Sequence, residues 1–395
     1  MIKVEKIEYI VLFLFAINFV NMESRLIFLL FLISVIWVNK CKIPKNRNIF
    51  ILIGFSSVFY ILSSIYHMDM LTYYILPYLL APTMGYIVGY QLMSYNSYNS
   101  DLQLKRIFYI LIFGRFFHGL LNFIVSNGYE NIVRNGNDVW TKSIIAATGQ
   151  GALMTMTISL LYFGIFVVPQ KRYIEKTFIL ISVWLCVLNN LKSASRTGII
   201  IMIVIFILCI IYTVLGAKYS SRKKFTIIGT LIVVLALGFL VYNNDFGGIK
   251  TNFENSALYS RVNNPVDYES GDENRKNMYL DAIRIGFTKP FGDGTLDTAH
   301  NFWLDIFKQT GFIPFLLALI YTINIIRDIW FIIKNHFVNE EIKYLILSVC
   351  TAVLINFAVE PIMKGMPYYF TVFCIMGGAM RKYVNRIKGR CINNE

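Results

Sequence analysis

Long apolar runs, separated by short polar intervals, dominate the pattern of this chain. Most runs are continuous over roughly 18–22 residues, the length that a helix needs to cross a bilayer. They do not alternate in polarity at every second position, as the strands of a membrane barrel do. The pattern predicts an all-α, polytopic transmembrane helical bundle of about 12 spans. We expect the spans near residues 8–21, 25–38, 48–66, 71–93, 106–126, 143–168, 174–191, 197–215, 225–242, 302–326, 341–359 and 367–380.

Composition favours the same class. Hydrophobic residues make up 56% of the chain and charged residues 15%, whereas soluble domains have about 25% charged residues. The net charge of +14 suggests nucleic-acid binding at first sight. The basic residues, however, lie in short loops between apolar runs, as orientation determinants do. We therefore expect a lipid bilayer, and no nucleic acid, as the partner of this surface.

The distribution of Lys and Arg predicts the orientation of the spans. Most basic residues fall in alternate short loops and in both terminal segments, and loops of this kind face the cytoplasm. We therefore expect the N- and C-termini in the cytoplasm. The same orientation places Arg196 and the polar interval 244–300 outside.

The expected organisation has three parts. Residues 1–243 carry spans one to nine, and residues 244–300 form a long external loop with short helices. Residues 301–395 carry the last three spans and a basic cytoplasmic tail.

Two local patterns predict structure inside the long loop. Ser270-Gly271-Asp272-Glu273 is typical of a capping box, so a helix should follow over about 271–287. Pro290-Phe291-Gly292-Asp293-Gly294 then predicts a tight turn. Arg275 and Arg284 are about 180° apart around such a helix, and they should face opposite sides.

Arg196 begins an apolar run within Lys192-Ser193-Ala194-Ser195-Arg196-Thr197-Gly198. It can be an interfacial side chain that extends toward water. It can also be an anion clamp, because the guanidinium fork matches the oxygens of a phosphate. Ser195 adds a hydroxyl beside it.

His300 directly precedes the predicted tenth span. A hydrogen-bonded structural role is one interpretation, and a general base toward a hydroxyl is the other. Asn301 and Asp305 could orient the ring, and a charge at Asp305 inside a predicted span itself suggests a role. Trp303 is a candidate for stacking on a sugar ring.

Other polar residues fall at membrane depth, where they form either a structural cluster or a functional one. They are Arg115, His118, Asn122, Gln150 and Glu360.

The sequence lacks the motifs of several kinds of chemistry. The six cysteines are scattered, and the sequence has no Gly-rich nucleotide loop, no Asp-x-Asp and no His/Cys cluster with ligand spacing. We expect no metal, no cofactor and no nucleotide-sugar substrate.

The chain resembles the O-antigen polymerase and O-antigen ligase superfamily of integral membrane glycosyltransferases. The resemblance is carried by Ser195-Arg196-Thr197-Gly198, by Arg275 with Pro290-Phe291-Gly292-Asp293-Gly294, and by His300-Asn301-Phe302-Trp303-Leu304 with Gly311. These pieces are short, and their order and spacing across roughly residues 190–325 make the match. The short segment between Gly294 and Ala299 departs from the family pattern.

The resemblance implies an enzyme of the bacterial cytoplasmic membrane whose active site faces the periplasm or outside. Its substrate would be an oligosaccharide linked to undecaprenyl pyrophosphate, and a chain-length regulator protein is an expected partner. Arg196 and Arg275 would hold the pyrophosphate, and His300 would deprotonate the acceptor hydroxyl. Lys192, Arg261 and Arg284 are additional cations that could bind substrate.

Three functions stay open at this point. The first is a polymerase that joins repeat units into O-antigen or capsular polysaccharide, which we favour. The second is a ligase that transfers glycan to lipid A-core. The third is a flippase for lipid-linked sugars, which should spread polar residues along a pathway through the spans.

Overall fold

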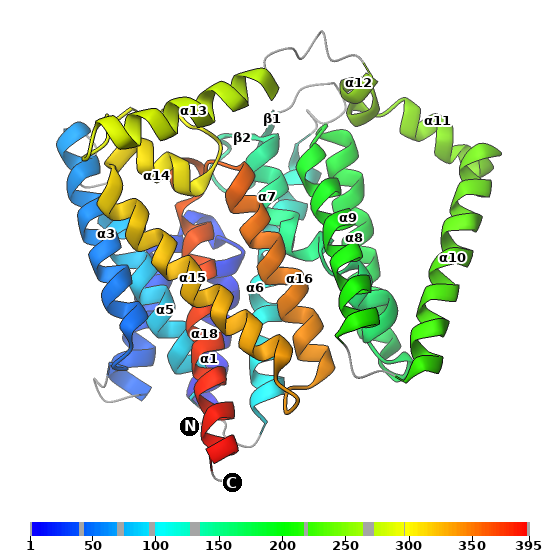
Figure 1. The fold of residues 1–395 in the computed structure, drawn as a ribbon, viewed down its shortest axis with the longest axis horizontal. Helices are drawn as coiled ribbons and strands as arrows, with labels where there is room; N and C mark the ends of the chain where they lie inside the picture. Colours follow the sequence, from blue (N-terminus) through cyan, green and yellow to red (C-terminus); the bar gives the residue numbers. More distant parts are fainter. Residues whose placement is uncertain are drawn as a thin grey trace. The chain divides into compact units, whose positions relative to one another are not determined.

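The computed structural model describes residues 2–38, 43–68, 75–94, 99–126, 135–216, 220–263, 272–295 and 297–392. Helices make up nearly all of the regular structure in these segments (Figure 1). The chain forms two compact units. The first contains Met1–His118, Ser270–Asn339 and Val353–Glu395, and the second contains Gly119–Glu269 and Glu340–Ala352.

The helical class predicted from the apolar runs is confirmed. Within the described residues, seven helices are long and apolar enough to cross a membrane, which indicates a membrane protein. The count of about 12 spans and the orientation stay predictions. The seven are Arg47–Tyr66, Ser100–Val125, Ala147–Val167, Gln170–Lys192, Arg196–Leu215, Phe312–Lys334 and Glu340–Val359.

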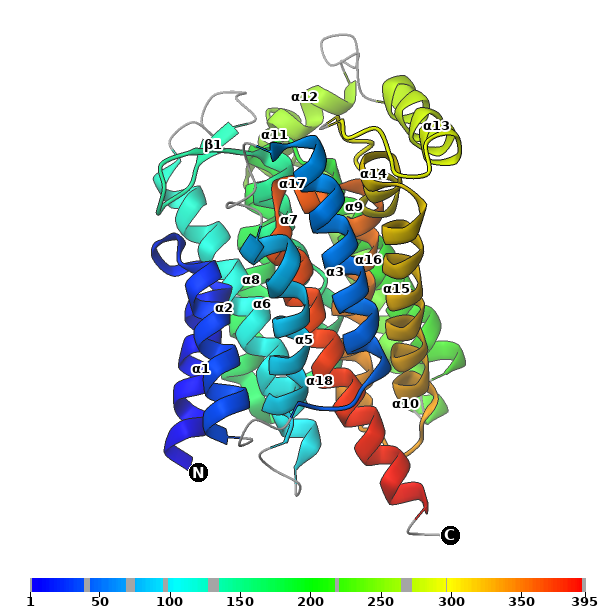
Figure 2. The same cartoon turned by 90° about the vertical axis from the view of Figure 1, so that its left-hand side faces the viewer.

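The first unit contains both the N-terminal and the C-terminal segments of the chain (Figure 2). Helix α1 begins and α18 ends at one end of this unit, and α13 lies across the opposite end. Its elements are α1 (Ile2–Ala16), η1 (Phe19–Asn21), α2 (Glu23–Leu32), η2 (Ile33–Val38), α3 (Arg47–Tyr66), η4 (Ile75–Leu80), α5 (Ala81–Leu92), most of α6 (Ser100–Val125), α13 (Asp272–Thr288), α14 (Phe302–Thr310), α15 (Phe312–Lys334), the last turns of α16 (Glu340–Val359), α17 (Ile362–Gly365) and α18 (Pro367–Ile392).

Glycines allow α5 and α18 to approach closely at the centre of the first unit. A Cβ at Gly89 would overlap the carbonyl of Ile375, and a Cβ at Gly378 would overlap the carbonyl of Tyr86. Small residues at such crossings let helix backbones meet, which is how many membrane helices associate. Helix α18 also packs against α15, α17 and η4, so this crossing positions much of the unit.

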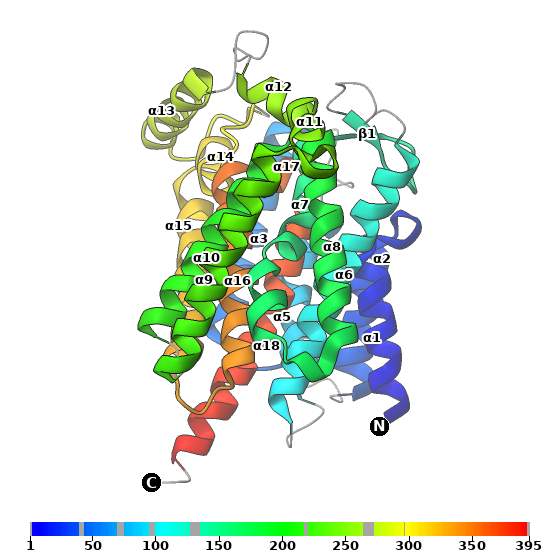
Figure 3. The ribbon, with the colours of Figure 1, turned by 90° about the vertical axis from the view of Figure 1, so that its right-hand side faces the viewer.

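The second unit holds the middle of the chain (Figure 3). A short antiparallel hairpin, β1 paired with β2, precedes its first complete helix. Its elements are the end of α6, β1 (Asn135–Asn137), β2 (Ile144–Ala146), α7 (Ala147–Ile158), η6 (Phe163–Val167), η7 (Gln170–Arg172), α8 (Tyr173–Lys192), α9 (Arg196–Leu215), α10 (Ser221–Asn243), η8 (Phe246–Gly248), α11 (Ile249–Glu254), α12 (Ala257–Asn263) and the start of α16.

Three boundaries differ from the expectation. The predicted span 302–326 is two helices, because Gly311 adopts φ +80° and ψ −162° and ends α14 before α15 begins. The predicted span 143–168 starts with strand β2, since the Asp138 carboxylate accepts the amides of Trp140 and Thr141 and forms a turn. The predicted first span stops at Ala16, because Asn18 and Val20 take left-handed conformations.

The patterns in the long loop are confirmed where the structure describes them. Helix α13 covers Asp272–Thr288, against the expected 271–287, while Ser270 and Gly271 of the proposed capping box lie outside the described residues. The interval 244–300 divides between the units, with α11 and α12 in the second and α13 in the first.

We predict that Gly89→Ala lowers the thermal stability of the detergent-purified protein, because the added methyl group forces α5 away from α18. Overpacking of this kind typically costs about 1–3 kcal/mol. Gly229→Ala on α10 is the matched control, since no atom lies within 4 Å of the added Cβ. Melting temperatures measured by scanning fluorimetry should fall for the first variant and not for the second. Equal melting temperatures would mean that the crossing tolerates a side chain.

Candidate functional site

Helix α13 turns one face toward α14. Ala282 is fully buried, and a Cβ at Gly286 would overlap the ring of Phe307 on α14. Arg275 and Tyr279 precede these residues at helical spacing on the same face, and both are half-buried. Arg284 is exposed, as expected for a residue on the opposite side of the helix.

The turn after α13 is attached to the end of α14 by backbone hydrogen bonds. The amide of Asp293 donates to the Lys308 carbonyl at 2.9 Å, and the amide of Gly294 donates to the Gln309 carbonyl at 3.2 Å. These carbonyls belong to the last turn of α14, where a helix leaves acceptors unsatisfied. Gly292 has φ +80°, and a Cβ there would overlap the Gln309 carbonyl. The predicted turn is confirmed, and only glycine fits at its centre.

The end of α3 holds the same turn from the other side. The Tyr66 hydroxyl donates to the Gly292 carbonyl at 3.1 Å. A ring nitrogen of His67 lies 2.8 Å from the Gly294 carbonyl. Sequence reasoning did not connect these residues with the long loop, because 225 or more positions separate them.

Asn301 caps α14. Its side-chain carbonyl accepts the amides of Trp303 and Leu304, both at 3.1 Å, and its amide group donates to the Ala358 carbonyl at 3.0 Å. The side chain predicted to bind substrate therefore already joins α14 to the end of α16.

His300 adopts φ +54°, a left-handed conformation that is uncommon for residues other than glycine, although Asn, Asp and His take it more often than the rest. Both neighbours are anchored: the Ala299 amide donates to Asp305, and Asn301 caps the helix. A strained backbone persists when its surroundings determine it, and such residues cluster at functional sites. The imidazole is half-buried.

Asp305 lies on the first turns of α14 with 9% of its surface exposed. One carboxylate oxygen accepts the Ala299 amide at 2.6 Å. Burial raises the pKa of this carboxyl to about 7. Backbone hydrogen bonds from Ala299 and Asn301 and the positive charges of Lys308 and Lys364 lower the pKa, but burial has the larger effect. Asp305 was predicted to orient the His300 ring; the contact observed is with the backbone just before that ring.

Several charged groups affect Tyr279. Its hydroxyl donates to the Ala358 carbonyl at 3.3 Å. Burial raises the pKa of the phenol, the charge of Arg275 lowers it, and the carboxylates of Asp305 and Glu360 raise it. Glu360 is 1% exposed, directly after α16. In the first unit, Arg275, Asp305 and Glu360 thus all act electrostatically on Tyr279, and Asp305 binds the backbone directly before His300.

The second unit contains Arg196. It is the first residue of α9, and its side chain is half-buried, so the predicted start of this helix is confirmed. Ala194, two residues earlier, has φ +52°. The Ser195 amide donates to the Asn190 carbonyl at 3.0 Å. A Cβ at Gly198 would overlap the Asn190 amide group, so the turn closes tightly over α8.

A layer of buried amides accompanies this turn in the second unit. Gln150 accepts a hydrogen bond from Asn122 and donates to Asn189, both at 3.3 Å, and donates to the Gly119 carbonyl at 2.6 Å. Asn122 in turn accepts the Val139 amide at 2.8 Å. Asn122 and Gln150 therefore have the structural role that sequence reasoning left open. Arg115 of the first unit likewise pairs with Glu23 at 2.6 Å.

The remaining candidate residues are placed as follows. Lys192 is exposed, with its amine 5.7 Å from the centre of the Phe123 ring. The Trp303 indole donates to the Thr322 hydroxyl at 3.2 Å and packs against Phe357. Arg261 belongs to α12, but its side chain lies outside the described part of the structure.

Sequence reasoning missed Tyr279 and did not connect Glu360 with the loop. The available signals were the position of Tyr279 one helical turn after Arg275, and an acidic residue at the end of an apolar run. Among the described residues, no group of three or more His, Cys, Asp or Glu side chains could hold a metal ion.

No protein-family model matches this sequence, and a comparison with curated proteins finds no match either. The resemblance to the O-antigen polymerase and ligase superfamily therefore rests on the motif residues themselves.

Stability should depend on pH through Asp305. Its pKa of about 7 lies above the ordinary value of 3.8, so the folded state retains a proton that the unfolded state releases. This contribution is fully present below about pH 4 and is lost as the pH rises through about 7. We expect the melting temperature of the wild type, relative to that of Asp305→Asn, to fall between pH 5 and pH 8.

Asp297→Asn is the matched control, because Asp297 is an exposed carboxylate in the same loop. It should keep the pH dependence of the wild type. A wild-type profile parallel to that of Asp305→Asn would show that Asp305 does not hold the proton.

Proposed function

We propose that the chain is a membrane glycosyltransferase that polymerises oligosaccharide repeat units carried on undecaprenyl pyrophosphate, into O-antigen or capsular polysaccharide. The observation that carries the proposal is His300 in a left-handed conformation between two anchored neighbours, with Asp305 bonded to Ala299 and with Arg275, Asp305 and Glu360 all acting on Tyr279. A fixed cation can stabilise a departing pyrophosphate, and an imidazole can accept the proton of the acceptor hydroxyl.

The proposed reaction needs two kinds of help. The acceptor hydroxyl loses its proton as its oxygen attacks the anomeric carbon of the donor. The bond from that carbon to the pyrophosphate oxygen breaks, and undecaprenyl pyrophosphate leaves with the electron pair. Fixed cations aimed at the developing negative charge lower this barrier more than most other devices.

Different residues stabilise the leaving pyrophosphate and accept the proton of the acceptor hydroxyl. Arg275 binds the pyrophosphate with its guanidinium fork, and His300 receives the proton of the acceptor hydroxyl. Asp305 is a positioning residue, because it holds the Ala299 amide next to His300. Arg196, in the second unit, keeps the role that its motif predicts, that of a cation that binds phosphate.

Arg275→Gln should abolish chain elongation, because the leaving group loses a fixed positive charge. We expect a fall in rate of roughly 10²–10³-fold, as for other groups that stabilise a developing anion. The measurement is the ladder of products formed by the purified protein from synthetic lipid-pyrophosphate repeat units. Arg196→Gln should have a similar effect.

Lys276→Gln is the control for Arg275→Gln, since Lys276 is the next residue of α13 and is exposed. It should give the wild-type ladder. Normal ladders from Arg275→Gln would refute the pyrophosphate role of this residue, and products found on an acceptor other than the lipid carrier would favour a ligase.

His300→Asn separates catalysis from backbone strain. Asn tolerates the left-handed conformation better than most residues, so the fold should persist while the base is lost. We expect turnover to fall by roughly 10²–10⁴-fold, with an unchanged melting temperature. Turnover close to the wild-type value would remove His300 from the mechanism.

A further inference from the structure

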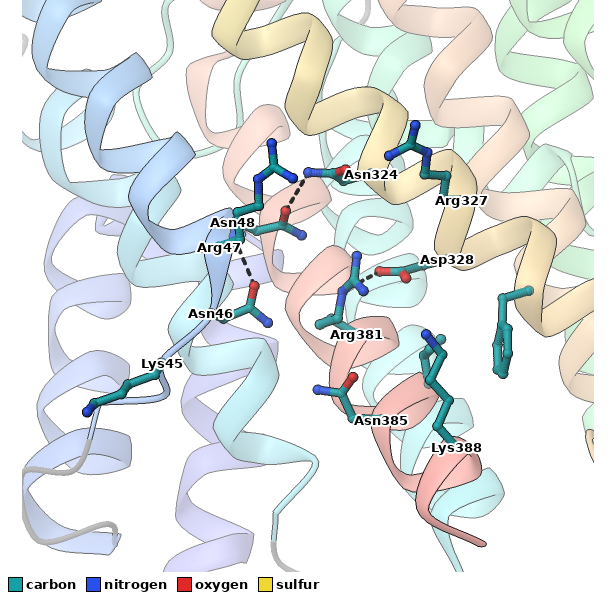
Figure 4. Close-up of a pocket in the computed structure, with 12 residues that line it drawn as sticks. Lys45, Asn46, Arg47, Asn48, Asn324, Arg327, Asp328, Arg381, Asn385 and Lys388 are labelled. Carbon is teal, nitrogen blue, oxygen red and sulfur yellow. Dashed lines mark hydrogen bonds and ion pairs between the residues drawn. The ribbon is translucent and has the colours of Figure 1, made fainter. Parts of the chain in front are cut away.

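A basic pocket opens in the first unit at the end where α18 finishes, opposite to α13 (Figure 4). Its volume is about 480 Å³. The start of α3, the second half of α15 and the last turns of α18 form its walls. Five cations line it: Lys45, Arg47, Arg327, Arg381 and Lys388.

One carboxylate faces these five cations. Asp328 on α15 is 3% exposed and lies 2.9 Å from Nε of Arg381 on α18, and Figure 4 shows the two side chains pointing toward one another. Because the pair uses Nε, the terminal nitrogens of the Arg381 fork are left for another acceptor. Within the described part of the chain, Lys45, Arg47 and Arg327 form no ion pair. The pocket therefore carries a net positive charge.

Neutral groups and the helix dipole add to this preference. The Asn324 amide group donates to Asn48 at 2.9 Å, and Asn48 donates to the Tyr86 hydroxyl at 3.2 Å. These bonds fix the wall between α15 and α3. The pocket also includes Asn46 to Asn48, the first turn of α3, where a helix carries a partial positive charge.

Orientation alone does not account for this arrangement. Basic residues that orient a membrane protein need only lie near the ends of its spans. Here, residues from three distant segments line one pocket, and a buried carboxylate fixes one of them. The pocket lies near the start of α3 and the end of α15, both of which are long and apolar enough to cross a membrane. Lipid headgroups occupy this level of a bilayer.

We propose that this pocket binds the phosphate group of an anionic membrane lipid. The guanidinium groups suit the oxygens of a phosphate, and basic pockets between membrane helices are known to hold such headgroups. The proposal concerns the end of the first unit opposite to His300 and does not depend on the glycosyltransferase function.

The test is a lipid titration of the purified protein in maltoside micelles, followed by melting temperature. Phosphatidylglycerol should stabilise the protein in a saturable way, and phosphatidylcholine should not. In Arg47→Gln/Arg327→Gln, the half-saturating lipid concentration should rise roughly 10–30-fold, as expected for two lost cations at a membrane surface. Both residues are exposed, so the melting temperature without added lipid should stay unchanged.

Lys171→Gln/Arg222→Gln is the charge-matched control, since it removes two exposed cations elsewhere. It should keep the wild-type half-saturation. Equal weakening in both double variants would show general charge attraction, and no weakening in either would show binding elsewhere; each result overturns the proposal.

A second arm uses glycerol 3-phosphate as a soluble probe of the same headgroup. A weak, saturable response that the Arg47→Gln/Arg327→Gln variant loses supports recognition of the phosphate itself. A response to the soluble probe without one to phosphatidylglycerol would assign the pocket to a soluble phosphate and overturn the lipid source.

Discussion

The close contact of α5 with α18 is the constraint on which the first unit depends. Carbonyl oxygens of each helix occupy the space that side chains at Gly89 and Gly378 would need. Apolar surface gives little direction to helices surrounded by lipid tails, so shape has to select the partner. The elements α15, α17 and η4 then pack against α18. The candidate site and the basic pocket lie at opposite ends of this packed body.

The candidate site is built from backbone groups as much as from side chains. The last carbonyls of α14 are satisfied by the turn after α13, and its first amides are satisfied by Asn301. Ala358 accepts from both Asn301 and Tyr279. Because each connection satisfies a polar group that would otherwise be buried alone, the loop has little freedom, and His300 is held in its unusual conformation.

Local patterns predicted much of this structure. The start of α9 at Arg196, helix α13 and the turn at Gly292 follow from short-range chemistry that the sequence displays. The break at Gly311 was missed, because the apolar run continues across it and a single glycine does not reveal its φ. Tyr279 and Glu360 were not assigned to the site, since their proximity depends on packing between segments about 80 residues apart. No local residue pattern predicts contacts between segments so far apart in the sequence.

The discontinuous first unit also has a consequence for how the protein is made. Its N-terminal helices leave the ribosome long before α18, yet the glycine face of α5 has its partner only in α18. During synthesis, α5 must wait in the bilayer while residues 119–269 are inserted. The contact between α5 and α18 can therefore form only after α18 has been made, and a nascent chain that lacks α18 would be a natural client for membrane chaperones and quality-control proteases.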